Sequence, residues 1–255
     1  MAKELLGALE LNRIYQMDCL EGMKLIPDKS IDMILCDLPY GVTACKWDSV
    51  IPFEPLWEQY ERIIKDNGAI VLTASQPFTS ALIMSNPKMF KYCWYWDKVR
   101  GVGHLNAKKQ PLKSVEEICV FYKKQCTYNP QMRDREKPRK SKNRSTQQVY
   151  GKSQDVFEGD ILEKRYPVTL LTFSKSKQED FTLHPTQKPV ALFEYLIKTY
   201  TNEGEIVLDN CMGSGTTAVA ALKTKRKFIG FEIVPEYVEI ANKRLENVWD
   251  ELKSV

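Results

Sequence analysis

The chain contains 255 residues, of which 43% are hydrophobic and 27% are charged, and its formal net charge is +4. This is the composition of a globular protein that can bury a full core without disulfides. Its seven cysteines are scattered without a C-x-x-C pair and only two histidines are present, so we expect reduced thiols, no metal site and neither a zinc-organised nor a secreted protein. We find no apolar stretch long enough to span a bilayer and no signal peptide, so the sequence predicts a cytoplasmic protein with no membrane partner.

The first 122 residues alternate between strand and helix patterns. Continuous apolar runs are typical of buried parallel strands, and apolar side chains three and four residues apart predict a helix that stops before Asn67-Gly68. The predicted strands are residues 14–17, 31–36, 69–73, 90–96 and 117–122, and the predicted helix is residues 54–65. A loop rich in glycine and lysine, residues 97–113, joins the last two strands.

The pattern stops between residues 123 and 183, which are polar, basic and irregular. Within this segment, residues 131–148 carry seven basic side chains and two acidic ones. Such a segment cannot build a core, and its charge suits phosphates and guanine edges, although a solvated basic loop without a partner has the same composition. The candidate nucleic-acid contacts are Arg133, Arg135, Lys137, Arg139, Lys140, Lys142 and Arg144.

The alternation of strands and helices resumes after residue 183. Helices are predicted at residues 189–200, at 216–222 and from 235 onward, and strands at residues 206–209 and 228–231. Strands that alternate with helices predict an α/β fold with a doubly wound, mostly parallel sheet. We therefore expect one domain made of two halves, residues 1–122 and 184–255, with residues 123–183 inserted between them.

A glycine turn, Gly213-Ser214-Gly215, follows the predicted strand that ends at Asp209. Such a turn lets a ligand approach bare backbone beside the N-terminal amides of the next helix. No lysine follows the second glycine, as a P-loop requires, and the third glycine of the dinucleotide fingerprint is absent. Glu232, at the end of the next strand, can accept both hydroxyls of a ribose. This order of elements favours an adenosine-containing ligand over a plain tight turn.

A second group of residues, Asp37-Leu38-Pro39-Tyr40, follows the predicted strand at 31–36. One interpretation is a polar turn in which Pro39 fixes the backbone and Asp37 caps local amides. The other is a site for a planar ring with an exocyclic amino group, which donates to Asp37 and the Leu38 carbonyl while Tyr40 stacks on the ring. Asp37 would then stabilise the positive charge that grows on the nitrogen as a methyl group arrives in line from a sulfonium donor. This chemistry needs no catalytic cysteine or histidine.

These segments resemble signature motifs of one family, the β group of amino-directed DNA methyltransferases that use S-adenosylmethionine. Asp37–Tyr40 looks like the family's D-P-P-Y, and Asp209–Thr217 is similar to D-P-F-x-G-x-G-T-T. The element H-P-T-Q-K-P stands unaltered at His184–Pro189. The resemblance implies a Rossmann-like class I methyltransferase fold with a seven-stranded sheet and a circularly permuted order of motifs, in which residues 123–183 recognise the target.

The resemblance also implies roles for the matching positions. Asp18 would contact the adenine of the cofactor and Glu232 its ribose, while Thr186 and Lys188 would reach the methionine carboxylate. The implied cofactor-binding residues are Asp18, Cys19, Asp37, Thr186, Lys188, Asp209, Met212, Gly213, Ser214, Gly215, Thr216, Thr217 and Glu232, and the catalytic residues are Asp37, Leu38, Pro39 and Tyr40. Two departures stand out: Leu38 replaces the first proline of the signature, and Asn210-Cys211-Met212 replaces Pro-Phe-x, which removes an aromatic side chain beside the donor.

Base flipping is implied as well, because the target nitrogen is shielded inside a duplex. Trp96-Asp97-Lys98 and the loop that follows look like the family's mobile segment beside the active site. Phosphate contacts from this loop are expected from Lys98, Arg100, Lys108, Lys109 and Lys113.

The sequence therefore predicts a site-specific methyltransferase that moves a methyl group from S-adenosylmethionine to N6 of adenine in double-stranded DNA. Cytosine N4 is the alternative; Asp37 favours adenine because cytosine enzymes of the family more often have serine at this position. An RNA amino-methyltransferase and a catalytically silent nucleic-acid-binding module also stay open, whereas Asp37 argues against a protein glutamine substrate. The resemblance favours a homodimer, and the sequence names neither a target site nor a restriction endonuclease partner.

Overall fold

The computed structural model describes residues 3–41, 48–140, 161–174 and 187–253, which form two compact units. The first unit contains residues up to Asn129 and from Thr169 onward, and the second contains Pro130–Val168. None of the helices in the described parts of the chain is long and apolar enough to cross a membrane.

An eight-stranded sheet runs through the first unit in the order β10-β6-β7-β5-β4-β11-β12-β3. Neighbouring strands are parallel except where β7 pairs with β5 and β6. The strands are β3 (Arg13–Gln16), β4 (Ile31–Asp37), β5 (Ile64–Ala74), β6 (Phe90–Val102), β7 (Lys113–Phe121), β10 (Leu170–Thr172), β11 (Ile206–Asp209) and β12 (Lys227–Glu232). The doubly wound, mostly parallel sheet is confirmed. The three-residue β10, which is too short to show a sequence pattern, adds an eighth strand to the expected seven.

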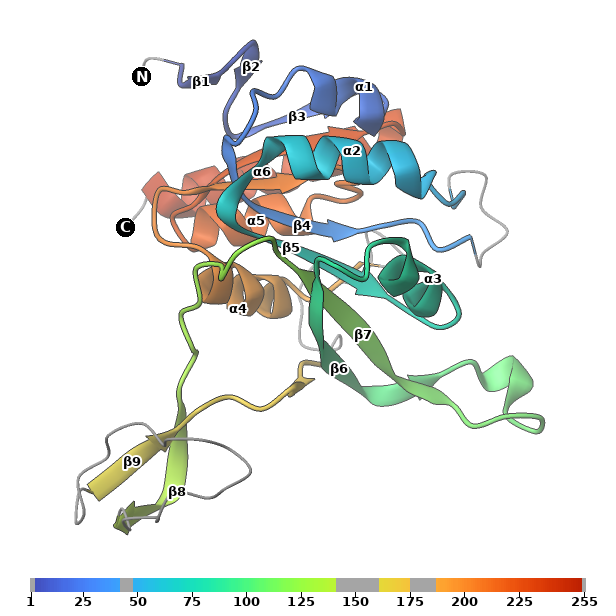
Figure 1. Cartoon of the computed structure of the whole chain (residues 1–255), viewed down its shortest axis with the longest axis vertical. Coiled ribbons are helices and arrows are strands. Elements are labelled where there is room, and N and C mark those ends of the chain that lie inside the picture. The colour runs from blue at the N-terminus through green and yellow to red at the C-terminus, as the bar shows by residue number, and fades with distance from the viewer. Residues whose placement is uncertain (1–2, 42–47, 141–160, 175–186, 254–255) are drawn as a thin grey trace. The chain divides into compact units, whose positions relative to one another are not determined.

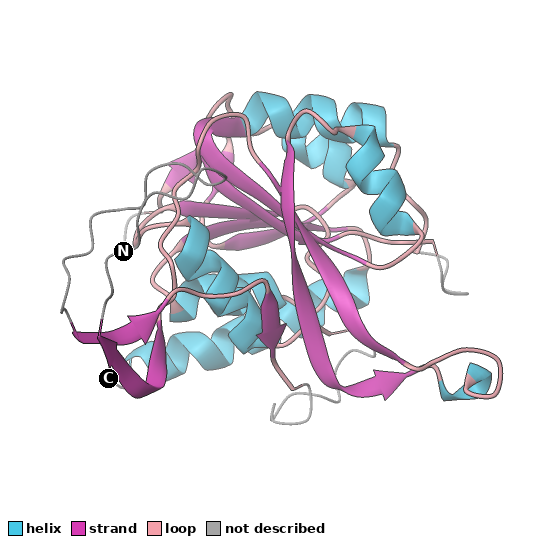
Figure 2. Cartoon of the chain, turned by 60° about the horizontal axis from the view of Figure 1, so that its bottom comes forward, coloured by secondary structure: helices cyan, strands magenta, loops and turns pink. Residues whose placement is uncertain are grey.

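Helices cover both faces of this sheet (Figure 2). Along β4 the side chains alternate between two cores: Met33 and Leu35 pack against one set of helices, and Ile34 and Cys36 against the other. The first face carries α4 (Val190–Tyr200), α5 (Thr216–Lys223) and α6 (Pro235–Lys253), and the second carries α1 (Cys19–Lys24), α2 (Phe53–Ile63) and α3 (Phe78–Ser85). This burial on both faces explains why β4 reads as a continuous apolar run.

A two-stranded arm corrects the loop expected at residues 97–113. β6 continues to Val102 and β7 begins at Lys113, and these two residues pair with each other. We call the ribbon beyond Asp97 and its partner Val115 the β6–β7 arm; it projects from the sheet and ends in a short 3₁₀ turn, η1 (His104–Asn106) (Figure 1, Figure 2). No strand pattern is present in this part of the sequence, because a ribbon outside the core has no buried face that requires apolar residues.

The described residues of the second unit contain two paired strands, whereas the composition predicted an irregular segment. β8 (Arg133–Lys140) pairs with β9 (Ile161–Arg165) in antiparallel fashion. The unit, Pro130–Val168, is narrower than the expected insertion because its flanks belong to the first unit. Cys126 and Leu171 are buried in the core of the first unit. A short hairpin of β1 (Leu5–Leu6) and β2 (Leu9–Glu10) precedes β3.

Candidate active site

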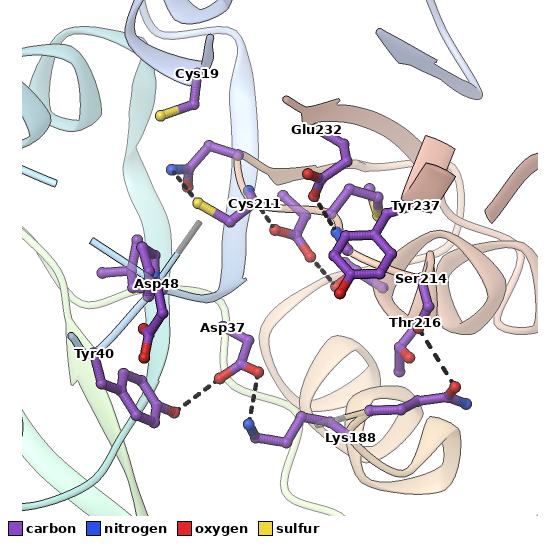
Figure 3. A pocket seen from close by; sticks show the side chains of 18 of the residues that line it. Cys19, Asp37, Tyr40, Asp48, Lys188, Cys211, Ser214, Thr216, Glu232 and Tyr237 are labelled. Atoms are coloured by element: carbon purple, nitrogen blue, oxygen red, sulfur yellow. Dashed lines mark hydrogen bonds and ion pairs between the residues drawn. The ribbon is translucent and has the colours of Figure 1, made fainter. Parts of the chain in front are cut away.

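A cavity of about 480 Å³ opens where β4, β11 and β12 end (Figure 3). The register of the parallel strands places their carboxyl ends along one edge, as expected for a ligand site in a doubly wound sheet. It brings together residues that the sequence analysis proposed on separate segments: Asp18, Cys19, Asp37, Leu38, Pro39, Tyr40, Lys188, Asp209, Met212, Gly213, Ser214, Thr216, Thr217 and Glu232 all line the cavity. Thr186 lies outside the described residues.

The two glycines of the turn have different structural reasons to be glycine. Both have positive φ, +52° at Gly213 and +84° at Gly215. A Cβ on Gly215, the residue before α5, would lie 2.9 Å from the Cβ of Ala241 in α6. A Cβ on Gly213 would meet only the carbonyl oxygen of Cys211, at 4.0 Å among the described atoms. Gly215 therefore permits helix packing, whereas Gly213 keeps the edge of the cavity bare.

Glu232 is fixed by backbone amides at the end of β12. One carboxylate oxygen accepts from the N–H of Gly213 at 2.7 Å, and the other from the N–H of Val234 at 2.8 Å. A carboxylate has about four acceptor positions, so these bonds orient Glu232 and still leave room for ligand hydroxyls. Asp18 caps α1 through one oxygen, which accepts from Leu20 and Glu21, and its placement at the cavity edge follows from that cap.

Asp37 is held by hydroxyl and ammonium donors on both of its oxygens. Oδ1 accepts from the hydroxyls of Tyr40, at 2.8 Å, and Thr73, while Oδ2 accepts from the Lys188 ammonium at 2.6 Å (Figure 3). Burial by itself raises the pKa of Asp37, but the Lys188 charge and these hydrogen bonds together hold that pKa below its usual value. Asp37 is therefore an ionised acceptor throughout the neutral range.

Tyr40, the last residue of the Asp37–Tyr40 motif, provides a neutral aromatic surface beside Asp37. Burial and the neighbouring charge of Asp37 raise its pKa well above the usual value. Its ring stacks on Phe78 of α3, with ring centroids 5.2 Å apart, and the Lys188 nitrogen lies 5.6 Å from its centroid.

Three polar side chains that the sequence analysis missed complete the cavity and the support of Asp37. Thr73 lies beside Asp37 because β4 and β5 pair at these positions. Glu116 of β7 bonds the Lys98 ammonium at 2.9 Å and lies 3.6 Å from that of Lys188. Gln187 is buried, and its Nε2 has no hydrogen-bond partner among the described residues. Only Gln187 had a local signal, since it stands inside the H-P-T-Q-K-P element.

The expected DNA contacts that the structure describes form two groups, one on the β6–β7 arm and one on β8, and one expected contact, Lys98, is buried. Arg100, Lys108, Lys109 and Lys113 are exposed on the β6–β7 arm. Arg133, Arg135, Lys137, Arg139 and Lys140 lie on β8 of the second unit, while Lys142 and Arg144 fall outside the described residues. Lys98 departs from the expectation: it is buried in its ion pair with Glu116, so it is not presented to a phosphate backbone.

Asp209 provides a pH-dependent contribution to stability. Burial raises its pKa to about 7, against hydrogen bonds from Thr217 and the backbone N–H of Cys211. Between the ordinary value of 3.8 and about 7, the unfolded chain releases this proton while the folded protein keeps it, so stability falls as pH rises through this window. The free energy of unfolding of Asp209→Asn, relative to the wild type, is expected to rise over the same window in urea titrations. An unchanged difference across the series would contradict this assignment.

Asn210 is anchored by a buried hydrogen bond from α2. The Tyr60 hydroxyl donates to its Oδ1 at 2.5 Å, and both residues are buried. Tyr60→Phe leaves this acceptor unsatisfied, so we expect the free energy of unfolding to fall by about 1–3 kcal/mol. The same change at the exposed Tyr95 serves as the control in chemical denaturation, and equal effects at the two positions would refute the expectation.

Comparisons with known proteins agree with this arrangement. A family model described as DNA methylase, for N6 and N4 methyltransferases, matches residues 31–243. The Type II methyltransferase M1.MboII of Moraxella bovis is 28% identical over 257 residues, which cover 92% of this chain and 96% of the relative. The DNA adenine methyltransferase YhdJ of Escherichia coli K12 is 29% identical over 261 residues, covering 93% and 83% of the two chains.

Among solved structures, the crystal structure of an M1.HpyAVI–SAM complex is similar, with a TM-score of 0.62 and 26% identity over 91% of this chain and 98% of that one. These matches confirm the class I methyltransferase fold expected from the motifs. The chain belongs to the N6/N4 family of DNA methylases.

Proposed function

We propose that this DNA methylase transfers a methyl group from S-adenosylmethionine to the exocyclic N6 of adenine in duplex DNA. The observation that carries the proposal is the ionised Asp37 beside Tyr40, in the same cavity as the glycine turn and Glu232. The first residue of the Asp37–Tyr40 motif is aspartate and not serine, which supports adenine over cytosine N4. The adenine specificity in the printed name of YhdJ supports the same choice.

The cavity fits S-adenosylmethionine in three respects. Glu232 can accept the ribose hydroxyls, the bare backbone at Gly213 leaves room for the ligand, and Gln187 offers a buried Nε2 donor that no described residue satisfies. A buried donor without an acceptor is costly, so a ligand carboxylate or carbonyl is the expected partner. When bound, S-adenosylmethionine supplies an electrophilic methyl group on a positively charged sulfur.

Asp37 and Tyr40 would hold the target base. The amino group of the base donates one N–H to Asp37 and one to the Leu38 carbonyl, and the ring lies against Tyr40. As the nitrogen is methylated it becomes positively charged, and the fixed carboxylate of Asp37 stabilises that charge without rearrangement. The nitrogen then loses one of its protons, with Asp37 as the nearest acceptor.

The basic side chains of the arm and of β8 would hold the DNA backbone. Each phosphate that lysine or arginine neutralises releases counterions, so affinity should fall steeply with salt. We propose the segment 123–183, whose described part includes the paired strands β8 and β9, as the target-recognition region.

Single-molecule sequencing of host DNA tests the proposed reaction. A methylation-deficient bacterial host that expresses the protein is expected to carry N6-methyladenine in one short sequence motif, and a host that expresses Asp37→Asn is the control. N4-methylcytosine without N6-methyladenine would overturn the choice of base. Methylated RNA with unmodified DNA would overturn the choice of substrate.

A further inference from the structure

We propose that Glu116 is a positioning residue that receives the Lys188 ammonium when the target base enters. This inference rests on the proposed function, in which the base amino group donates to Asp37. It names the residue that makes Asp37 available to that amino group.

Lys188 occupies the place that the amino group needs. Its ammonium bonds Oδ2 of Asp37 at 2.6 Å, while Oδ1 already accepts from Tyr40 and Thr73. The same nitrogen lies over the ring of Tyr40, where the target base is expected to stack. A positively charged nitrogen between Asp37 and Tyr40 resembles the methylated amine of the reaction, so Lys188 competes with the substrate for one site.

Glu116 is the acceptor to which this ammonium can move. Its Oε2 lies 3.6 Å from Lys188 Nζ, is buried, and makes no hydrogen bond to any described residue. Its other oxygen is fixed by Lys98 of β6 at 2.9 Å. Lys188 and Glu116 are almost fully removed from solvent, with side chains 7% and 16% exposed. A buried cation that loses its partner costs several kcal/mol unless another anion receives it, and Glu116 supplies that anion within a short movement.

The charged and titratable groups around Lys188 are few in the described part of the chain. Asp37 approaches from the end of β4, Glu116 from β7 and Tyr40 from the segment that follows β4, and Lys98 of β6 faces Glu116. Glu116→Gln keeps the shape of the side chain and removes the competing anion. The ammonium should then stay on Asp37 and exclude the base.

The proposed transfer of the Lys188 ammonium from Asp37 to Glu116, which we call the handover, can be tested by steady-state kinetics. The assay measures methyl transfer to a duplex that contains the target motif identified by sequencing. Glu116→Gln is expected to lower kcat/KM for DNA about ten- to a hundredfold, the size of effect typical of coupling between charged side chains in contact. The affinity for S-adenosylmethionine should stay unchanged. Lys188→Met removes the competitor, so adding Glu116→Gln to it should cost little more.

Glu117→Gln is the matched control. Glu117 is the next residue of β7, points to the other face of the sheet and accepts from Thr79 at 3.2 Å, so its change should leave kcat/KM as in the wild type. Equal activity of Glu116→Gln and wild type would refute the handover. So would a loss of the same size in the Lys188→Met background, or a loss confined to cofactor affinity. Failure of the wild type to methylate any DNA would instead refute the proposed function.

A second inference rests on a different observation, the apolar end of the β6–β7 arm. We infer, on the basis of the proposed function, that Leu105 is a wedge that enters the duplex at the position of the extruded base. Leu105 stands in the 3₁₀ turn at the tip and is fully exposed, at 102%. The turn is ordered by its own backbone bonds, from Asn106 to Gly103, Ala107 to His104 and Lys109 to Asn106, so the side chain is held outward on a defined support.

DNA is the partner that this tip fits. Lys108 and Lys109 follow the leucine in the same loop, and Lys98 and Val102 of β6 line the cavity that contains Asp37. Leu105 is therefore only three residues along the chain from Val102, which lines the cavity proposed to hold the target base. Proteins that unstack a duplex commonly insert one apolar side chain between the bases, and basic side chains beside it bind the phosphates.

Duplexes that differ in the cost of flipping test the wedge. Leu105→Ala is expected to lower kcat/KM about ten- to a hundredfold on the fully paired target, and to approach the wild type on a duplex with an abasic site opposite the target base. Leu105→Met should keep most activity, and Met84→Ala, at an exposed apolar residue on α3 (72% exposed), should change nothing.

Equal activity of Leu105→Ala and wild type on the paired duplex would refute the wedge. A defect that is the same on the abasic duplex would refute it as well. If Leu105→Ala converts a dimer to a monomer in sedimentation, the tip binds a second copy of the chain and the inference is wrong.

Discussion

Replacing Asp37 with asparagine is expected to lower the rate of methyl transfer about a hundred- to a thousandfold, the cost of removing one fixed group that stabilises transition-state charge. Asparagine keeps the shape and one acceptor oxygen but carries no negative charge to oppose the charge that grows on the amino nitrogen. It also leaves Lys188 with Glu116 as its remaining anionic partner among the described residues, so some loss of folding stability should accompany the change.

Transfer of tritiated methyl groups to DNA, measured at a temperature where circular dichroism shows both proteins folded, checks this expectation. Asp28→Asn is the control, because Asp28 pairs with Arg62 and its side chain is 73% exposed. The assignment of Asp37 would be wrong if Asp37→Asn turned over near the wild-type rate.

The two glycines of the turn are expected to fail in different ways when each is replaced by alanine. Both changes place a Cβ in the left-handed region, at a cost of about 1–2 kcal/mol. Gly215→Ala also brings the new Cβ to 2.9 Å from the Cβ of Ala241. Because α5 and α6 must then move apart, we expect a further cost of about 1–3 kcal/mol. Gly213→Ala meets no such contact among the described atoms, but its methyl group enters the cavity edge.

Chemical denaturation and calorimetric titration with S-adenosylmethionine separate these effects. Gly215→Ala should show the larger loss in free energy of unfolding. Gly213→Ala should stay the more stable of the two and lose about tenfold or more in cofactor affinity, since one misplaced methyl group is worth that much in a close contact. Unchanged affinity in Gly213→Ala would mean that the cofactor does not approach this backbone.

Local sequence patterns predicted most of the strands of the large sheet and most of its helices. The apolar run of β4 and the helical spacing of α2 were readable because burial imposes a period on the sequence, and β11 begins and ends at the residues predicted. The arm and β8 were missed for the complementary reason: their strands pair outside a core, so polar and charged residues fill them and no period marks them.

The sequence alone predicted seven of the eight strands of the large sheet, four of the six described helices, and the motifs at Asp37–Tyr40 and Asp209–Thr217, because burial and backbone freedom restrict which residue types occur there. It did not predict α1, α3 or β10, which are short. It did not determine which charges meet. Lys188 lies 151 residues from the carboxylate it pairs with, and Thr73 and Glu116 belong to strands whose order only the folded sheet establishes. Lys98 was expected to contact phosphates but is buried against Glu116. The sequence states which side chains are charged. Which charged side chains meet depends on the tertiary structure, because it decides which strand ends lie side by side.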